Sequence, residues 1–285
     1  GAGVGAGRQA AREERREPHG ARPQVGAAAE LVVVARARHL DRAHGREEEP
    51  RRAALGELER QRAKFLTGTL SAFLQNCKEQ HRQWAAHGLA YLRSHHQMPA
   101  LRQNLPGHFC WQRNDTDIED ARAMAYGHAF VMLAAAHGVR AYIDNAADLL
   151  EESWQLMEEL FWDADHGAYA DERDQTLNIL SHYRGQNANM HAVEALLAAY
   201  ESTNETRYLD RASIISHKFT VAMTGLTNGQ IWEHYTTDWQ HDWYYNIDKP
   251  DDLFKPWGYQ PGHQVEWAKL LLQLNRHQPA EWHLD

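Results

Sequence analysis

The sequence predicts an all-α domain that begins near residue 65 and is built from pairs of helices joined by short β-hairpins. Three observations support this fold class. From Phe65 onward, apolar residues recur at helical spacing along most of the chain. Three aromatic, acidic segments between the helices alternate bulky and polar residues, which is typical of short hairpins. Each of these segments leads to a histidine near the start of an apolar helix, which indicates a weak internal repeat.

Residues 1–64 are a different kind of sequence, rich in Arg, Ala, Glu and Gly. They contain 14 Lys and Arg against 10 Asp and Glu, a charge of +4, so the remainder of a chain with charge −9 carries −13. Every Phe, Trp and Tyr lies at or after Phe65. With little to bury, this segment is expected to be a disordered or non-native leader. Its acidic runs and lack of aromatic residues argue against an arm that binds nucleic acid.

Seven helices are expected from the apolar periodicity, at residues 65–74, 84–92, 124–136, 146–161, 190–200, 208–223 and 265–274. The hairpin-like segments are 107–117, 161–174 and 229–239, where Asp, Asn and Gly supply the turn chemistry. One helical pair cannot cover its own apolar face, so the pairs are expected to stack. Stacked in a line they form a solenoid, and closed in a ring they form an α/α toroid.

The repeat places His128, His191 and His263 near the starts of three helices, at intervals of 63 and 72 residues. In a toroid the starts of alternate helices converge on one mouth, so these histidines are expected around one pocket. The alternative is a surface histidine or a hydrogen-bonded core histidine, and that alternative is strongest for His128.

Two of these histidines are followed three residues later by a glutamate, Glu194 after His191 and Glu266 after His263. Residues three apart share a helix face, and backbone N–H groups in a first turn favour strongly hydrogen-bonding ligands. Three chemistries could use such pairs: metal binding, glycoside hydrolysis by two carboxylates, or proton transfer next to a sugar carbonyl. The order is the reverse of the Glu-x-x-His of di-iron bundles, and each carboxylate has a histidine beside it, so proton transfer is favoured.

Polar residues crowd the start of the helix that carries His191. Asn187 and Asn189 do not favour helix interiors, so they are better explained as caps or ligand contacts. Trp267 is interpreted either as a core residue or as part of a platform on which a sugar stacks.

Four motifs together resemble the N-acylglucosamine 2-epimerase family. They are "YRGQNANMHAVEALLAAYE" at 183–201, "AYGHAFVMLAAA" at 125–136, "IWEHYTTDW" at 231–239 and "FKPWGYQPGHQVEWAKLLLQL" at 254–274. The resemblance covers roughly residues 81–278 and looks closest to the aldose-ketose isomerase branch, which handles mannose and sulfoquinovose. It implies an (α/α)6 barrel, a toroid of helical hairpins around a central pocket, that works without a redox cofactor.

The resemblance also implies a reaction. The sugar ring opens, a proton leaves C2 to give an enediol, and the isomerase branch returns that proton to C1. Carried over by motif, His263 is the catalytic acid/base and His191 assists it. The residues expected to bind or orient substrate are Arg184, Asn187, Glu194, Glu266, Lys255 and His128.

Two functional residues of the family have no counterpart here. The family's second catalytic histidine lies in a C-terminal helix pair, and its substrate-binding arginine matches the region of residues 1–64. We therefore expect a barrel incomplete at both ends, with exposed apolar helix faces, low stability and little activity. Residues 65–285 are expected to form this partial isomerase domain.

The alternative functions are a 2-epimerase acting on an N-acylhexosamine or a disaccharide, and a non-catalytic helical-repeat module that binds sugar. The expected partner is a small-molecule sugar, with no nucleic acid, membrane, metal or other cofactor; a homo-oligomer is left open. Two cysteines, Cys77 and Cys110, cannot build a disulfide framework, which favours the cytoplasm. The longest apolar runs are too short to span a bilayer.

Overall fold

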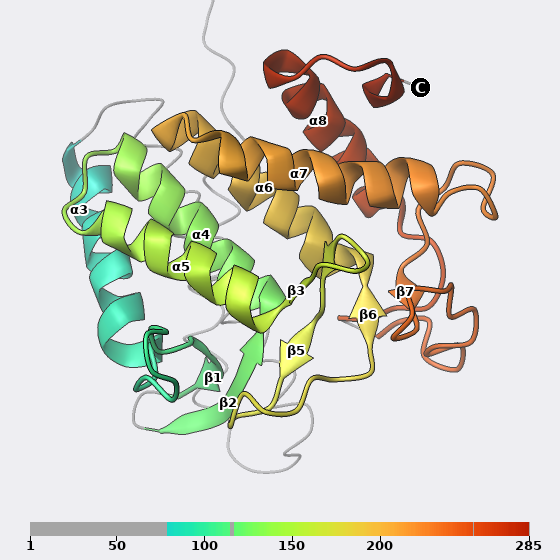
Figure 1. Ribbon diagram of the computed structural model, residues 1–285. Coiled ribbons are helices and arrows are strands. Elements are labelled where there is room, and N and C mark those ends of the chain that lie inside the picture. Colours follow the sequence, from blue (N-terminus) through green and yellow to red (C-terminus); the bar gives the residue numbers. More distant parts are fainter. Residues whose placement is uncertain (1–78, 115–116, 253, 285) are drawn as a thin grey trace, which may run out of the picture. The chain divides into compact units, whose positions relative to one another are not determined.

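Helical hairpins make up most of the structure, a computed structural model that describes residues 79–114, 117–252 and 254–284. Figure 1 shows the helices in chain order. They are α3 (Glu79–Tyr91), α4 (Ala125–Arg140), α5 (Ala146–Leu160), α6 (Gln186–Thr203), α7 (Thr206–His217) and α8 (Pro261–His277). Short π-helical turns continue α3 (Leu92–His96) and α7 (Lys218–Ala222), and a 3-10 turn (Glu281–His283) follows α8.

Six of the seven predicted helices are confirmed, with shifts at their ends. The prediction at 84–92 falls in α3, and those at 124–136 and 146–161 correspond to α4 and α5. The predictions at 190–200, 208–223 and 265–274 correspond to α6, α7 and α8. The predicted helix at 65–74 and the leader at 1–64 lie outside the described residues.

Short strands connect the helices. β1 (Cys110–Arg113) pairs with β2 (Ile118–Met124), which also pairs with β5 (Glu172–Arg173). β3 (Trp162–Asp163) pairs with β4 (Ala168–Tyr169), and β6 (Arg184–Gly185) pairs with β7 (His234–Tyr235). All of these pairs are antiparallel.

The hairpin predictions are met unevenly. Segment 161–174 contains the β3–β4 hairpin as predicted. Segment 107–117 contains only β1, because the partner strand β2 begins after the segment, at Ile118. Segment 229–239 contains β7, and Tyr235 in this strand forms a local antiparallel bridge with His241, just beyond the segment. The prediction did not include the second pairing of β7, with β6 from a distant part of the chain. This long-range pairing joins the residues that precede α6 to the segment that precedes the loop into α8.

The hydrophobic core lies between the helices. α4 packs against α5 and α6, and α6 packs against α7 and α8. Figure 1 shows α6, α7 and α8 as neighbours. Small alanines line α4 and α6, including the buried Ala135 and Ala195, and small side chains allow two helix axes to approach closely. The helices α5 and α7 bury only one face, which contains larger residues such as Leu156 and Ile215.

Candidate active site

Side chains from the first two turns of α4, α6 and α8 contact one another. Nε2 of Gln186, the first residue of α6, lies 2.8 Å from Nδ1 of His263 near the start of α8. Also on α6, the ring of His191 lies 5.2 Å from that of Tyr126 and 4.8 Å from that of Phe130, both on α4. The starts of the helices converge, as the sequence repeat predicts.

His263 contacts a buried carboxylate from a different segment. Its Nδ1 lies 2.9 Å and 3.0 Å from the two carboxylate oxygens of Glu233, a residue that is 3% exposed and directly precedes β7. The register of β6 and β7 sets Gly185 opposite His234, which brings the next residue, Gln186, to Glu233. Gln186 Nε2 donates to the two Glu233 oxygens at 3.1 Å and 2.9 Å. The Nδ1 side of the imidazole therefore contacts a buried carboxylate, while 22% of the His263 side chain is exposed.

His191 has a carboxylate on its own helix, as the spacing predicts. Its Nδ1 lies 3.2 Å from Oε2 of Glu194, and Nζ of Lys269 on α8 donates to Oε1 of the same glutamate at 2.9 Å. Burial alone would raise the pKa of Glu194. The hydrogen bonds from His191 and Lys269 and their charges outweigh burial and lower that pKa to about 2. Glu194 therefore stays ionised and joins α6 to α8.

A small open depression lies between α6 and α8. Its lining combines apolar and ionisable side chains: Met190, His191, Glu194, Glu266, Lys269 and Leu270. Glu266 is exposed and follows His263 by one helical turn. The predicted residues His191, Glu194 and Glu266 are thus brought together at one surface depression.

The two asparagines at the start of α6 have different environments. Asn189 is fully buried, accepts from the backbone N–H of Tyr169 at 2.8 Å and donates to the carbonyls of Tyr169 and Gly185 at 2.9 Å and 3.0 Å. Asn187 is partly exposed, and its Oδ1 is buried without a hydrogen-bond partner among the described residues. An unsatisfied carboxamide oxygen at a helix start is suited to a ligand hydroxyl.

His128 lies in the core and not in the depression. Its Nδ1 donates to the Met124 carbonyl at 2.8 Å, and its Nε2 accepts from the Phe109 backbone N–H at 3.1 Å. It is 1% exposed, and burial lowers its pKa to about 4, although the Met124 hydrogen bond opposes this shift. Both ring nitrogens are committed to backbone groups. This environment favours the core-histidine alternative, so we leave His128 out of the proposed substrate site.

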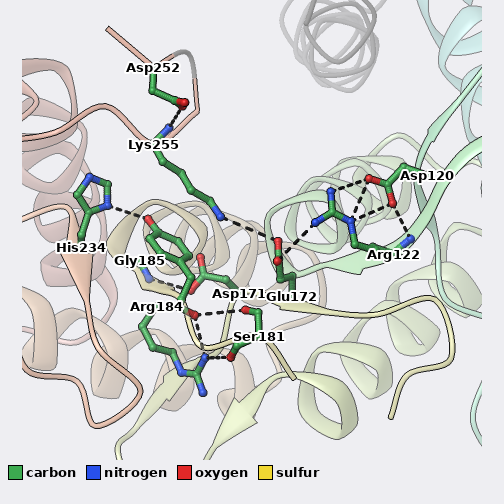
Figure 2. Close-up of polar contacts among 11 residues, drawn as sticks. Asp120, Arg122, Asp171, Glu172, Ser181, Arg184, Gly185, His234, Asp252 and Lys255 are labelled. Atoms are coloured by element: carbon green, nitrogen blue, oxygen red, sulfur yellow. Dashed lines mark hydrogen bonds and ion pairs between the residues drawn. The ribbon is translucent and has the colours of Figure 1, made fainter. Parts of the chain in front are cut away.

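Arg184 also has a structural environment. It is 5% exposed, and its Nη1 donates to the backbone carbonyls of Ser181 and Tyr183 at 2.7 Å and 2.8 Å. Figure 2 shows its guanidinium directed to Ser181. The guanidinium stabilises the turn before α6 through these hydrogen bonds, so we do not assign Arg184 to substrate binding.

Lys255 lies among acidic and aromatic groups. Its Nζ is 4.0 Å from Glu172 and 3.9 Å from the centroid of the Tyr183 ring, and Figure 2 shows the ammonium directed to Glu172.

The nearby Asp171 accepts from the Gly185 backbone N–H at 2.7 Å. Burial raises the pKa of Asp171 to about 7, although Lys255 and the Gly185 hydrogen bond act in the opposite direction.

Glu233, Gln186 and Asp171 were not among the site residues predicted from the sequence. Glu233 and Gln186 do lie within the motifs used to identify the family resemblance. A signal for Glu233 was present, because a glutamate between Trp232 and His234 in an aromatic run is a candidate for burial, and a buried glutamate requires partners. Its pairing with His263 depends on long-range strand register, which the local pattern does not contain.

Among the described residues, no three His, Cys, Asp or Glu side chains gather as a candidate metal site. Within the same residues, no helix combines the length and the apolar character that crossing a membrane requires.

Comparison with known proteins places these features in context. A sequence profile described as N-acylglucosamine 2-epimerase (GlcNAc 2-epimerase) matches residues 70–284. A D-mannose isomerase from Marinomonas mediterranea is 40% identical over 222 residues, covering 78% of this chain and 55% of that protein. A D-mannose isomerase from Thermobifida fusca is 38% identical over 157 residues, covering 55% and 39% of the two chains.

Solved structures show the same fold. A crystal structure of D-mannose isomerase matches with a TM-score of 0.74 and 39% identity, covering 78% of this chain and 56% of that one. A cellobiose 2-epimerase from Bacillus thermoamylovorans matches in fold with a TM-score of 0.66 at 16% identity, covering 78% and 56%. These matches confirm the predicted (α/α)6 barrel fold class. The chain spans about half the length of these relatives.

Proposed function

We propose that this chain, which belongs to the N-acylglucosamine 2-epimerase family, forms the histidine-bearing part of a mannose-type aldose-ketose isomerase. The named function of the D-mannose isomerase relatives supports the substrate class. The match over residues 70–284 supports a domain boundary near residue 65. The substrate is therefore a small-molecule sugar. A cytoplasmic location is proposed because the chain has only two cysteines, Cys77 and Cys110.

The observation that carries this proposal is a pair of imidazoles at adjacent helix starts, each with Nδ1 beside a carboxylate. His263 on α8 is paired with Glu233, and His191 on α6 is paired with Glu194. An imidazole that is oriented by a carboxylate is suited to general acid-base catalysis. Two such groups match a reaction that moves protons on both carbon and oxygen.

The proposed reaction begins with the open-chain aldose, which has an aldehyde at C1 and a hydroxyl at C2. His263 takes the proton from C2, the C2–H electron pair forms the C1=C2 double bond, and O1 gains a proton to give the enediol. The O2 hydroxyl then loses its proton, the C2=O bond forms, and His263 returns a proton to C1. The net change moves one hydrogen from C2 to C1 and one from O2 to O1. We assign the proton transfers at oxygen to His191.

The remaining site residues are proposed to hold the sugar. The unsatisfied Oδ1 of Asn187 would accept a hydrogen bond from a hydroxyl, and the exposed carboxylate of Glu266 would accept another. Glu194 would act mainly by holding His191. Lys255 is paired with Glu172 in this structure, so its proposed contact would be with a polar group reaching the rim of the site.

A 2-epimerase is the second candidate, favoured by the description of the matching family. Both reactions share the first proton transfer, and they differ in the carbon that is reprotonated. An epimerase returns the proton to C2 on the opposite face, so it forms no ketose.

Incubating the purified chain with mannose and, separately, with N-acetylglucosamine distinguishes the candidates. We expect slow formation of fructose from mannose, and we expect His263→Ala to abolish it. The matched control is Asp238→Asn, which removes an exposed carboxylate from the turn after β7 and should leave the rate unchanged. Formation of N-acetylmannosamine without any ketose would replace the isomerase with the epimerase. Sugar binding without turnover of either substrate would indicate a binding module.

The metal alternative is tested in the same assay. A chelator should leave turnover unchanged under the proposed mechanism, since the two histidines supply the acid and the base. Loss of turnover that zinc or manganese restores would contradict that mechanism.

A further inference from the structure

The contact between Glu233 and His263 is part of a cluster of four side chains that also contains Gln186 and Trp267. The indole N–H of Trp267 can only donate, and it lies 2.6 Å from Oε1 of Gln186. This contact assigns the Gln186 carboxamide, which is otherwise ambiguous, with its oxygen toward Trp267. Gln186 must therefore present its NH2 to Glu233, which accepts at 2.9 Å and 3.1 Å.

The protonation of His263 follows from the same contacts. An ionised carboxylate only accepts hydrogen bonds, so the His263 nitrogen 2.9 Å from Glu233 must carry a proton. Gln186 Nε2 lies 2.8 Å from the same nitrogen but is itself a donor, so it cannot take that proton. In the neutral imidazole the proton is therefore on Nδ1, and the basic lone pair is on Nε2.

Three of the four residues are buried. Glu233, Gln186 and Trp267 are 3%, 0% and 1% exposed. The backbone N–H of Gln186 donates to the Glu233 carbonyl at 3.1 Å, which continues the β6–β7 ladder by one residue. Trp267 lies one turn after His263 on α8 and stacks on Phe219 at a centroid distance of 5.8 Å. Glu233 is thus fixed from two sides and sealed from solvent.

We propose that Glu233, fixed by Trp267 through Gln186, is the positioning residue that sets the tautomer of His263 and directs its Nε2 to the substrate. This inference rests on the proposed function for its catalytic consequence, but the tautomer itself can be tested without turnover. Glu233 is 3% exposed and both of its carboxylate oxygens contact His263 and Gln186, so its proposed role is to act through His263. Its role is to keep the correct nitrogen basic and to stabilise the imidazolium after proton abstraction.

The substitution Glu233→Gln makes a specific change to this arrangement. A carboxylate offers acceptors to both Gln186 and His263, whereas a carboxamide offers one acceptor and one donor. Because Trp267 fixes the Gln186 amide as a donor, the histidine is the partner that can adapt, by accepting at Nδ1. The proton then moves to Nε2, the nitrogen that the reaction needs as a base. Glu233→Asp keeps two acceptor oxygens and should keep the native tautomer.

The first measurement is the imidazole ¹⁵N spectrum of the chain labelled at its histidines, with His263 assigned from the signals lost in His263→Gln. We expect the Nδ1–H tautomer in the native chain and in Glu233→Asp, and the Nε2–H tautomer in Glu233→Gln. Asp238→Asn, on the same connecting segment, should show the native spectrum. A native His263 in the Nε2–H form, or a tautomer unchanged by Glu233→Gln in a folded protein, would overturn the proposal.

The second measurement is the pH dependence of mannose turnover. Glu233→Gln should lower kcat by about 100-fold, within the range that general acid-base catalysis supplies, with KM nearly unchanged. The acid limb of its residual kcat/KM profile should move to lower pH, because the imidazolium has lost a stabilising negative charge. Glu233→Asp should recover part of the rate. A tautomer change with no loss of rate would contradict the catalytic role, whereas absence of native turnover would contradict the proposed function and leave the tautomer result standing.

Discussion

Among the residues predicted for the site, burial and neighbouring groups combine differently to set the pKa of each side chain. Glu194 and His128 are both substantially buried, yet each keeps the charge state that its surroundings favour. Glu194 is held ionised by His191 and Lys269, whereas His128 is held neutral by its burial between Met124 and Phe109. Glu194 and His128 are therefore expected to change the free energy of unfolding in different pH ranges.

Glu194 should stabilise the fold above pH 4.5. Its pKa falls from 4.5 to about 2 on folding, so its contribution is complete above the unfolded pKa and is lost as pH falls toward 2. That shift corresponds to at most roughly 3 kcal/mol, and solvent screening makes the expected value smaller. Urea unfolding at pH 6 and pH 3 measures it. Glu194→Gln should weaken the pH dependence in this window, and the exposed Asp165→Asn should not; equal slopes in all three proteins would contradict the assignment.

His128 should destabilise the fold as pH falls from 6.5 toward 4. Its folded pKa of about 4 lies below the unfolded value, so the unfolded chain binds the proton more readily in that window. The loss of unfolding free energy is roughly 3 kcal/mol, complete below pH 4. His128→Asn should be less stable at pH 7 because the backbone contacts to the ring are disrupted, but it should lose less stability on acidification. A variant that keeps the full native loss would show that another group titrates.

At the scale of elements, the site depends on how each helix begins. α6 begins at Gln186, four residues before the predicted start at Met190. The later start was predicted because Asn187 and Asn189 have low helix propensity and were expected outside the helix. Tertiary hydrogen bonds overcome that propensity: Asn189 satisfies both backbone groups of Tyr169 in β4 and the carbonyl of Gly185. Helix periodicity predicted the element, but the bonds that fix its start come from a distant hairpin.

Removing the Asn189 side chain should loosen the start of α6. Asn189→Ala leaves the buried backbone groups of Tyr169 and Gly185 unsatisfied, and we expect a loss of roughly 2 to 4 kcal/mol in unfolding free energy. Thermal unfolding followed by circular dichroism measures this change. The exposed Asn178→Ala is the control and should change stability by less than about 0.5 kcal/mol. Equal effects of the two substitutions would show that the hydrogen bonds of Asn189 do not stabilise the fold.

The strands show where prediction from the sequence stops. The alternation of bulky and polar residues correctly indicated extended structure in 229–239, but it could not indicate that β7 pairs with β6. This pairing brings Glu233 to Gln186 and His263, and it forms only when residues about 50 positions apart meet. For the same reason Arg184 and His128 were expected to bind substrate, since their burial depends on neighbours that the local sequence does not identify.

For the whole molecule, the sequence motifs were sufficient to predict the family and the fold class. The spacing of His191 and His263 reflects the repeat of helical hairpins, and the D-mannose isomerase structure matches the chain with a TM-score of 0.74. The chain covers 56% of that structure, so the activity has to be tested on this protein directly. The central claim is that proton transfer by a histidine, and not transfer of hydride, isomerises the sugar.

The most direct test of that claim is the position of deuterium after turnover of mannose in D2O, read by NMR. Proton transfer through His263 exposes the abstracted hydrogen to exchange, so fructose should form with deuterium at C1, and His263→Ala should form neither product nor label. Deuterium at C2 of an aldose without ketose would identify an epimerase. Fructose that forms without any solvent deuterium at C1 would contradict the account, because a hydrogen held on the partly exposed imidazole of His263 is expected to exchange with solvent during slow turnover.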